Sequence, residues 1–287
     1  MQLTACERGN FLDELIGVMT MIASQAEAVR AVCACALAAI LTLSGCASPG
    51  GSGTGAGTTG TVASEASAAT VRRVDFLTDY TRLQPVPGGG GILCWRDASV
   101  DWKRYDKVLF ERILVYLPSG STKPIDPSDL KTLLDYFHGA LVKATTPEAR
   151  IVNAAGPGVL SVQIALTSLV PTNTTASLAG TAIPYGFVAE IGSGAATGRP
   201  AGSTPYLGRT GMEVKFRDGA SGKVVAECAD TEIGLKYAAD LNAGVAGAAE
   251  SWVNGYMDSF QQWTYAKNAF DKWASVFAQR FAALRSA

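Results

Sequence analysis

The sequence predicts a single α+β domain in which two main helices pack on a mostly antiparallel sheet of about five strands. Residues 160–167 alternate apolar and small polar side chains, the period-two pattern of a strand with one buried face. Residues 212–233 indicate two strands joined by the turn sequence Asp-Gly-Ala-Ser-Gly, a strong hairpin signal. Residues 126–143 and 263–281 repeat apolar side chains every three or four positions, as amphipathic helices do.

The expected order of elements is β-α-β-β-(insert)-β-β-α. Residues 108–117 form the first strand, because they are rich in β-branched and large apolar side chains and stop at a proline. Residues 150–154 are expected to form a short strand after the first helix. Residues 172–209 are small and Gly-rich and predict a long insert with one short helix near 184–195. Residues 237–260 carry no clear pattern.

Asp126 and Pro127 mark the best-defined helix start in the chain. An aspartate side chain accepts hydrogen bonds from the free amides of the first turn, and proline suits the first helical position. The last helix presents a stripe of large side chains at helical spacing. We expect this stripe to pack on the sheet, with a partner site as the alternative. Its members are Trp263, Ala266, Phe270, Trp273, Phe277 and Phe281.

Residues 1–45 are predicted to form a signal peptide. Its apolar centre, Ala31–Leu43, has 13 residues without a charge. This is shorter than the roughly 17–25 residues of a spanning helix and suits the apolar region of a signal peptide. Acidic residues near Met1 do not suit the basic start of such a peptide, so translation is expected to begin at Met19 or Met21. An atypical signal that begins at Met1 is the alternative.

Leu43-Ser44-Gly45-Cys46 resembles a bacterial lipobox, in which the chain is cut before the cysteine and lipid is attached to its sulfur. Palmitate-type acyl chains on Cys46 would anchor the protein in a membrane. Residues 46–70 are predicted to be a flexible Gly/Ser/Thr linker, followed by a globular domain at residues 71–287. Ala47 stands where an inner-membrane retention signal has aspartate. The expected location is therefore the periplasmic face of the outer membrane.

Charge argues against nucleic acid as a partner. Once everything before Cys46 is removed, 22 basic and 21 acidic residues remain. A chain this close to neutral lacks the basic excess of nucleic-acid-binding proteins and of polybasic membrane patches. The expected partners are the membrane, through the lipid on Cys46, and an envelope protein.

Cys94 and Cys228 are the two cysteines that remain in the predicted domain after Cys46. In an oxidising compartment they are a candidate disulfide between the start of the domain and its last strand, worth about 2–4 kcal/mol. Two separately buried thiols are the alternative. No Cys-x-x-Cys or Cys/His spacing suggests a metal site, and no cofactor is expected.

No catalytic constellation is predicted. His138 is the single histidine and lies beside the apolar face of the first helix, where a structural or solvated role is expected. Asp230 and Glu232 lie on one face of a predicted strand and could in principle perform acid–base chemistry, but a solvated or hairpin-pairing role is favoured. Gly55–Gly60 matches G-x-G-x-x-G without the strand and helix that nucleotide binding requires.

Several phrases together resemble a family of bacterial lipoproteins known as domain of unknown function 3313. The resemblance covers about Val71 to the end of the chain, and the Gly/Ala-rich stretch at 243–249 is long for the pattern. It implies no activity and no functional residues. The phrases are Phe76-Leu77-x-Asp79-Tyr80-x-x-Leu83, Tyr105-Asp106-Lys107-Val108, Gly156-Pro157-Gly158-Val159-Leu160, Glu213 with Arg217-Asp218 and Ser221-Gly222, and Trp273-Ala274.

The expected function is that of a lipid-anchored envelope lipoprotein without catalytic activity, which binds another envelope component through its Gly-rich loops. An envelope hydrolase that uses carboxylates is the first alternative, and a purely structural spacer is the second. A deep pocket with convergent acidic residues would favour the hydrolase. A shallow, apolar-rimmed face would favour the binding module.

Overall fold

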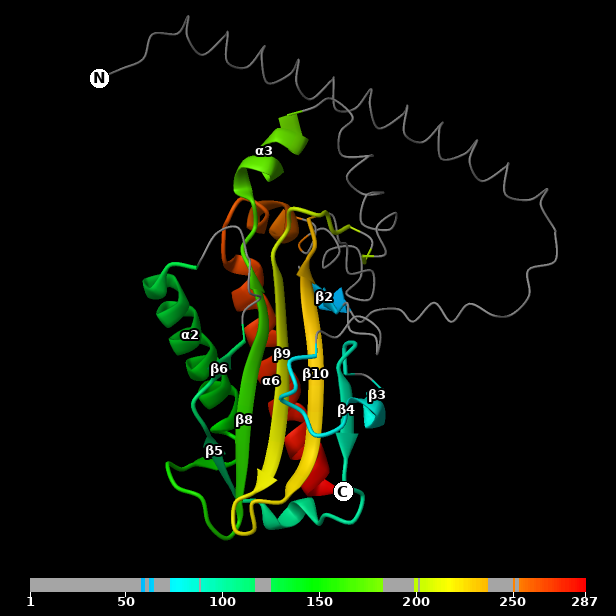
Figure 1. Cartoon of the computed structure of the whole chain (residues 1–287), viewed down its shortest axis with the longest axis vertical. Helices are drawn as coiled ribbons and strands as arrows, with labels where there is room; N and C mark the ends of the chain where they lie inside the picture. Colours follow the sequence, from blue (N-terminus) through cyan, green and yellow to red (C-terminus); the bar gives the residue numbers. More distant parts are fainter. Residues whose placement is uncertain are drawn as a thin grey trace, which may run out of the picture. The chain divides into compact units, whose positions relative to one another are not determined.

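A computed structural model shows a mixed sheet with long helices on one face (Figure 1). All described residues lie in one unit, Thr54–Ala287. The structure describes residues 58–59, 62–64, 73–87, 89–116, 125–182, 199–200, 202–236, 250 and 253–287. The predicted signal peptide, the lipobox with Cys46, and the helix expected near 184–195 therefore lie outside the described residues.

Three long antiparallel strands form the centre of the sheet. They are β8 (Val159–Val170), β9 (Arg209–Asp218) and β10 (Val224–Gly234). β9 pairs with both neighbours along most of its length. The turn between β9 and β10 follows the hairpin prediction, and Gly222 takes a φ of 71° there, which favours glycine.

Shorter strands extend the sheet on both sides. The order along the main path is β1-β2-β10-β9-β8-β5-β7; β4 also pairs with β10, and β6 with β8. These strands are β1 (Thr58–Thr59), β2 (Val62–Ser64), β3 (Gln84–Pro85), β4 (Leu93–Arg96), β5 (Lys107–Phe110), β6 (Leu114–Val115) and β7 (Arg150–Ile151).

The prediction of about five mostly antiparallel strands is correct only in outline. The described sheet has ten strands, and β5, β6 and β7 take part in parallel pairs. Parallel pairing follows from the chain path, because a helix lies between β6 and β7 and carries the chain back across the sheet. The strand expected over 108–117 is broken, since residues 111–113 have no strand structure.

Two long helices pack on each other and on one face of the sheet. α2 (Pro127–Thr145) begins where predicted, and the Asp126 carboxylate accepts a hydrogen bond from the Ser128 amide at 2.7 Å. α6 (Thr264–Ser286) buries its aromatic stripe in the main core. The rings of Phe137 and Phe270 stack with centroids 4.3 Å apart where the helices meet. The core interpretation of the stripe is thus confirmed.

Shorter helical segments complete the described part, the last of them at residues 253–258. The first two are single 3₁₀ turns, η2 (Tyr80–Arg82) and η3 (Trp102–Arg104). The third, α3 (Thr174–Ala182), falls in the stretch that was expected to be a loop. No helix in the described part of the chain is long and apolar enough to cross a membrane.

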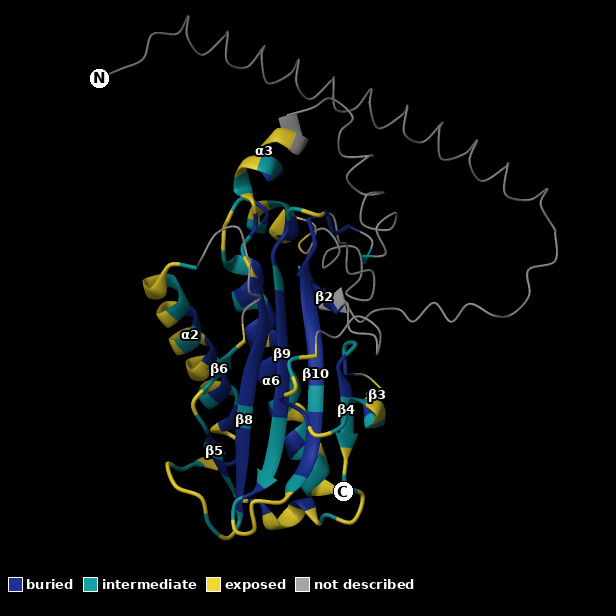
Figure 2. Ribbon diagram, in the orientation of Figure 1, coloured by how far each residue is buried: buried dark blue, intermediate teal, exposed yellow. Residues whose placement is uncertain are grey.

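The second face of the central sheet is covered by residues 73–85, here called the covering segment (Figure 1). Figure 2 shows β8 and β10 buried along most of their length. The prediction that β8 has one buried face is therefore wrong, because Ser161, Ala165 and Thr167 on its second face are buried as well. A second apolar cluster forms there from Phe76, Leu77, Leu83, Leu93, Ala165 and Ala229.

The predicted linker also needs correction. Val62–Ser64 forms β2, pairs with the last part of β10 and is fully buried. The Ser64 hydroxyl donates to the Asp230 carboxylate at 2.6 Å. Gly91 is required beside it, since a Cβ at Gly91 would lie 2.3 Å from the Ser64 Cβ. The ordered domain therefore begins before Val71, because β10 offers a hydrogen-bonding edge that small residues can occupy.

Candidate functional site

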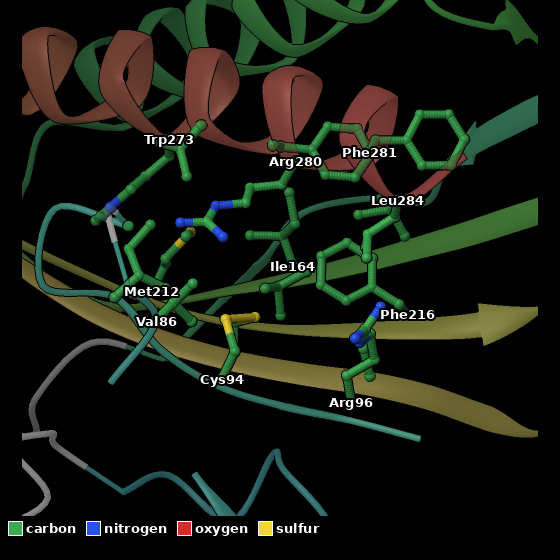
Figure 3. A pocket seen from close by; sticks show the side chains of 18 of the residues that line it. Val86, Cys94, Arg96, Ile164, Met212, Phe216, Trp273, Arg280, Phe281 and Leu284 are labelled. Carbon is green, nitrogen blue, oxygen red and sulfur yellow. A yellow bond between two sulfur atoms is a disulfide. The ribbon is translucent and has the colours of Figure 1, made fainter. Parts of the chain in front are cut away.

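An apolar cavity of about 380 Å³ lies between the sheet and α6. Its size falls within the range of small-molecule sites, about 300–1,000 Å³. The period-two register of β9 places Met212, Val214 and Phe216 on its wall, and α6 supplies Trp273 and Phe277 opposite. Figure 3 shows Met212 and Phe216 on the sheet side of the cavity and Trp273 on the side of α6.

The mouth of the cavity carries positive charge. Arg96, Pro87 and Ala283 line it and are exposed, so the cavity reaches the surface there. Arg280 extends from α6 toward the sheet and donates to the Pro87 carbonyl (Figure 3). Arg96 and Arg280 are the charged residues of the described lining, which contains no Asp or Glu.

A buried polar network closes the inner end of the cavity. The indole nitrogen of Trp273, which lines the cavity, donates to the Asp230 carboxylate at 2.8 Å. Lys272, the preceding residue on α6, forms an ion pair with Glu232 and donates to the Gly90 carbonyl at 2.8 Å. The network therefore ties α6 to β10 and to the turn before β4.

Asp230 and Glu232 do lie on one face of β10, but the expectation that they are solvated is wrong. Their residues are each 1% exposed, because α6 covers this face of the strand. Burial raises the pKa of Glu232 well above its usual value, and the neighbouring Asp230 adds to the effect while Lys272 opposes it. Their hydrogen bonds are made within the core, which gives them a structural role in the described fold.

Cys94 and Cys228 are joined by a disulfide with a Cα–Cα distance of 4.1 Å. The two residues lie directly opposite each other in β4 and β10. Both line the cavity, and their sulfur atoms are visible on its sheet side in Figure 3. The bond thus holds β4, which carries Arg96, against the central sheet.

Two carboxylates on the opposite face hold the covering segment. Glu213 accepts hydrogen bonds from the Tyr80 hydroxyl at 2.8 and 2.9 Å. Glu227 accepts from the Thr78 amide at 2.7 Å and pairs with Arg82 at 3.3 Å. Burial raises the pKa of Glu213 to about 7, while the Tyr80 hydrogen bond partly opposes this shift.

This shift predicts a pH-dependent stability. The folded state retains a proton on Glu213 that the unfolded state has released, so stability falls as pH rises from 4.5 to about 7. The contribution is roughly 2–3 kcal/mol, at about 1.4 kcal/mol per pKa unit. Urea denaturation of the Glu213→Gln variant should show a smaller fall over this interval than the parent chain. Equal pH profiles for both proteins would contradict the assignment.

His138 is exposed on α2 and packs edge-on against the ring of Phe110, with centroids 6.3 Å apart. This placement agrees with the structural or solvated role expected for it. Within the described ranges, no group of three or more His, Cys, Asp and Glu residues is placed to hold a metal ion.

The sequence matches the family described as "Protein of unknown function (DUF3313)" over residues 72–254. The chain belongs to this family. The match includes the covering segment, the central strands and the sheet side of the cavity, but ends before α6. Among curated proteins, none matches the chain. Membership in DUF3313 therefore identifies the domain but indicates no activity for it.

Distant structural neighbours of this DUF3313 protein include PelC from Paraburkholderia phytofirmans, solved as a dodecamer. It is 10% identical with a TM-score of 0.31, and the match covers 64% of this chain and 96% of PelC. A DUF4136 family protein from Bacteroides thetaiotaomicron is 15% identical with a TM-score of 0.23, covering 59% and 96% of the two chains. Likenesses this distant carry no functional inference.

The cavity and the two arginines at its mouth were not predicted from the sequence. Each wall was visible as a pattern, in the alternation of β8, in the hairpin signal of β9 and β10, and in the aromatic stripe of α6. A periodic pattern shows which face of an element is buried, but not whether the opposing side chains meet. Arg96 had one signal that could have been used, since it follows Cys94 by two residues and so lies on the same face of a strand.

Proposed function

We propose that this protein is a lipid-anchored, non-catalytic binding module of the bacterial envelope, and that it binds an apolar envelope component in the cavity between the sheet and α6. The observation that carries the proposal is the cavity itself: about 380 Å³, lined by apolar side chains and reaching the surface at exposed residues. A cavity with these properties is the usual form of a site for an apolar small molecule.

The anchor in this proposal is the lipobox Leu43-Ser44-Gly45-Cys46. Lipid on Cys46 would hold the module at the periplasmic face of the outer membrane, where lipids and envelope proteins are its neighbours. Stable anchoring requires more than one acyl chain, which bacterial lipoproteins carry.

Four buried carboxylates of β9 and β10 are placed for structural contacts rather than for hydrolysis. Hydrolysis by two carboxylates needs both groups to face the same substrate. Asp230 and Glu232 are instead engaged with Trp273, Ser64 and Lys272 in the core. Glu213 and Glu227 are engaged with the covering segment on the far face of the sheet.

Site-specific photo-crosslinking in intact cells tests this function. A photoreactive phenylalanine replaces Phe216 on the cavity wall, and in a matched control it replaces Tyr136, which is exposed on α2. We expect an adduct at position 216 that is absent at position 136 and that decreases in a Cys46→Ala background. Equal labelling at both positions, or no adduct at 216, would contradict the proposal.

A further inference from the structure

We propose that the occupant of the cavity is an amphiphile with a single acyl chain and an anionic head, and that Arg96 and Arg280 bind the head at the mouth. This inference rests on the proposed function, in that it assumes that the cavity is a binding site. It adds the chemical class of the ligand and the two residues that recognise it. Neither family membership nor the structural neighbours suggest it.

The depth of the cavity favours an acyl chain. The lining runs from exposed Arg96 and Ala283 to core residues such as Phe137 and Ile164, which are almost fully buried. If the cavity stayed empty, its lining would lose packing contacts on one side. An acyl chain restores these contacts and brings no polar group that the buried walls would leave without a hydrogen bond. A peptide would bring backbone amides and carbonyls that these walls could not satisfy.

The charges at the mouth favour an anionic head. The side chain of Arg96 makes no hydrogen bond or ion pair with another described residue. Arg280 donates to the carbonyl of Pro87, which leaves its charge without a carboxylate partner among the described lining residues. Guanidinium groups bind carboxylates and phosphates with paired, charge-assisted hydrogen bonds. A neutral lipid would fill the cavity but would give neither guanidinium group an anionic partner.

The two arginines come from different parts of the fold. Arg96 ends β4, which the Cys94–Cys228 disulfide holds to β10, and Arg280 lies near the end of α6. Figure 3 shows both heads beside the apolar lining, with the sheet and the helix on either side. The arrangement places two positive charges beside an apolar volume, which is complementary to the chemistry of a fatty acid or a lysophospholipid.

Binding of defined lipids to the full chain tests the proposal. The chain carries Cys46→Ala so that its own lipid cannot occupy the cavity. Isothermal titration calorimetry then compares palmitate, palmitoyl lysophosphatidic acid and hexadecanol, all below their aggregation concentrations. We expect one site per chain, with at least one anionic lipid about tenfold tighter than hexadecanol or more. Tighter binding of palmitate identifies a carboxylate site, and tighter binding of the lysophospholipid identifies a phosphate site.

Variants separate the contribution of the anionic head from that of the acyl chain to the binding affinity. We expect the double variant Arg96→Gln/Arg280→Gln to lose about tenfold or more in affinity for the anionic lipid and to retain the affinity for hexadecanol. Arg112→Gln, at an exposed arginine outside the cavity lining, is the matched control. Ala226→Phe, which fills the cavity from β10, should abolish binding of all three lipids. Shortening the acyl chain should weaken binding about fourfold per CH₂.

Each claim can fail separately. Equal affinity for hexadecanol and both anionic lipids, or unchanged affinity in the arginine double variant, would overturn the role of Arg96 and Arg280. If none of the lipids binds the parent chain, the ligand class is wrong. The proposed function survives that result if the photo-adduct at position 216 proves to be an envelope component of another class, and it fails if there is no adduct.

Discussion

Removal of the disulfide, by Cys94→Ala together with Cys228→Ala, is expected to lower the free energy of unfolding by about 3–5 kcal/mol. The bond joins residues 134 positions apart, so reduction releases a long closed loop in the unfolded chain. Chain-entropy arguments assign the largest stabilisation to such long loops. The loss should also free β4, which pairs with β10 through only four residues and carries Arg96.

Urea denaturation of the oxidised parent, the reduced parent and the double variant measures this effect. The reduced parent and the variant should unfold at similar, lower urea concentrations than the oxidised parent. Reductant should leave the variant unchanged, which controls for effects on other groups. An oxidised parent no more stable than the variant would show that the loop is already constrained without the bond.

Replacement of Lys272 with methionine is expected to cost about 3–5 kcal/mol of stability at neutral pH. The Lys272 side chain is 2% exposed and pairs with Glu232, whose side chain is 0% exposed. The methionine fills a similar volume but leaves the carboxylate buried without its cation. The variant should be less destabilised at acid pH, because Glu232 can then take up a proton and lose its charge.

Substitution of Glu232, the partner of Lys272, provides the control. Adding Glu232→Gln to Lys272→Met removes the unpaired charge, and we expect the double variant to recover part of the lost stability. A double-mutant cycle by urea denaturation gives the coupling between the two residues. Additive losses for the two substitutions would mean that the ion pair does not stabilise the junction of α6 with β10.

The two carboxylates of β10 show where sequence reasoning reached its limit. Their spacing placed them correctly on one face of the strand, because side chains alternate along any strand. Whether that face meets water or a helix depends on residues forty or more positions away, and here Trp273 and Lys272 cover it. The surroundings of Glu213 likewise depend on a distant residue, since its hydrogen-bond partner Tyr80 lies 133 residues earlier in the chain.

The sequence by itself determined the elements whose signals are local. Asp126 and Pro127 mark a helix start, the alternation in β8 and the turn before Gly222 mark strands, and the α6 stripe marks a buried helix face. These signals act within a few residues, through backbone hydrogen bonds and side-chain periodicity. The remaining features depend on how these elements pack together in the tertiary structure. Packing at long range pairs Cys94 with Cys228, buries β2 in the sheet, and leaves a cavity between α6 and the strands with two arginines at its mouth.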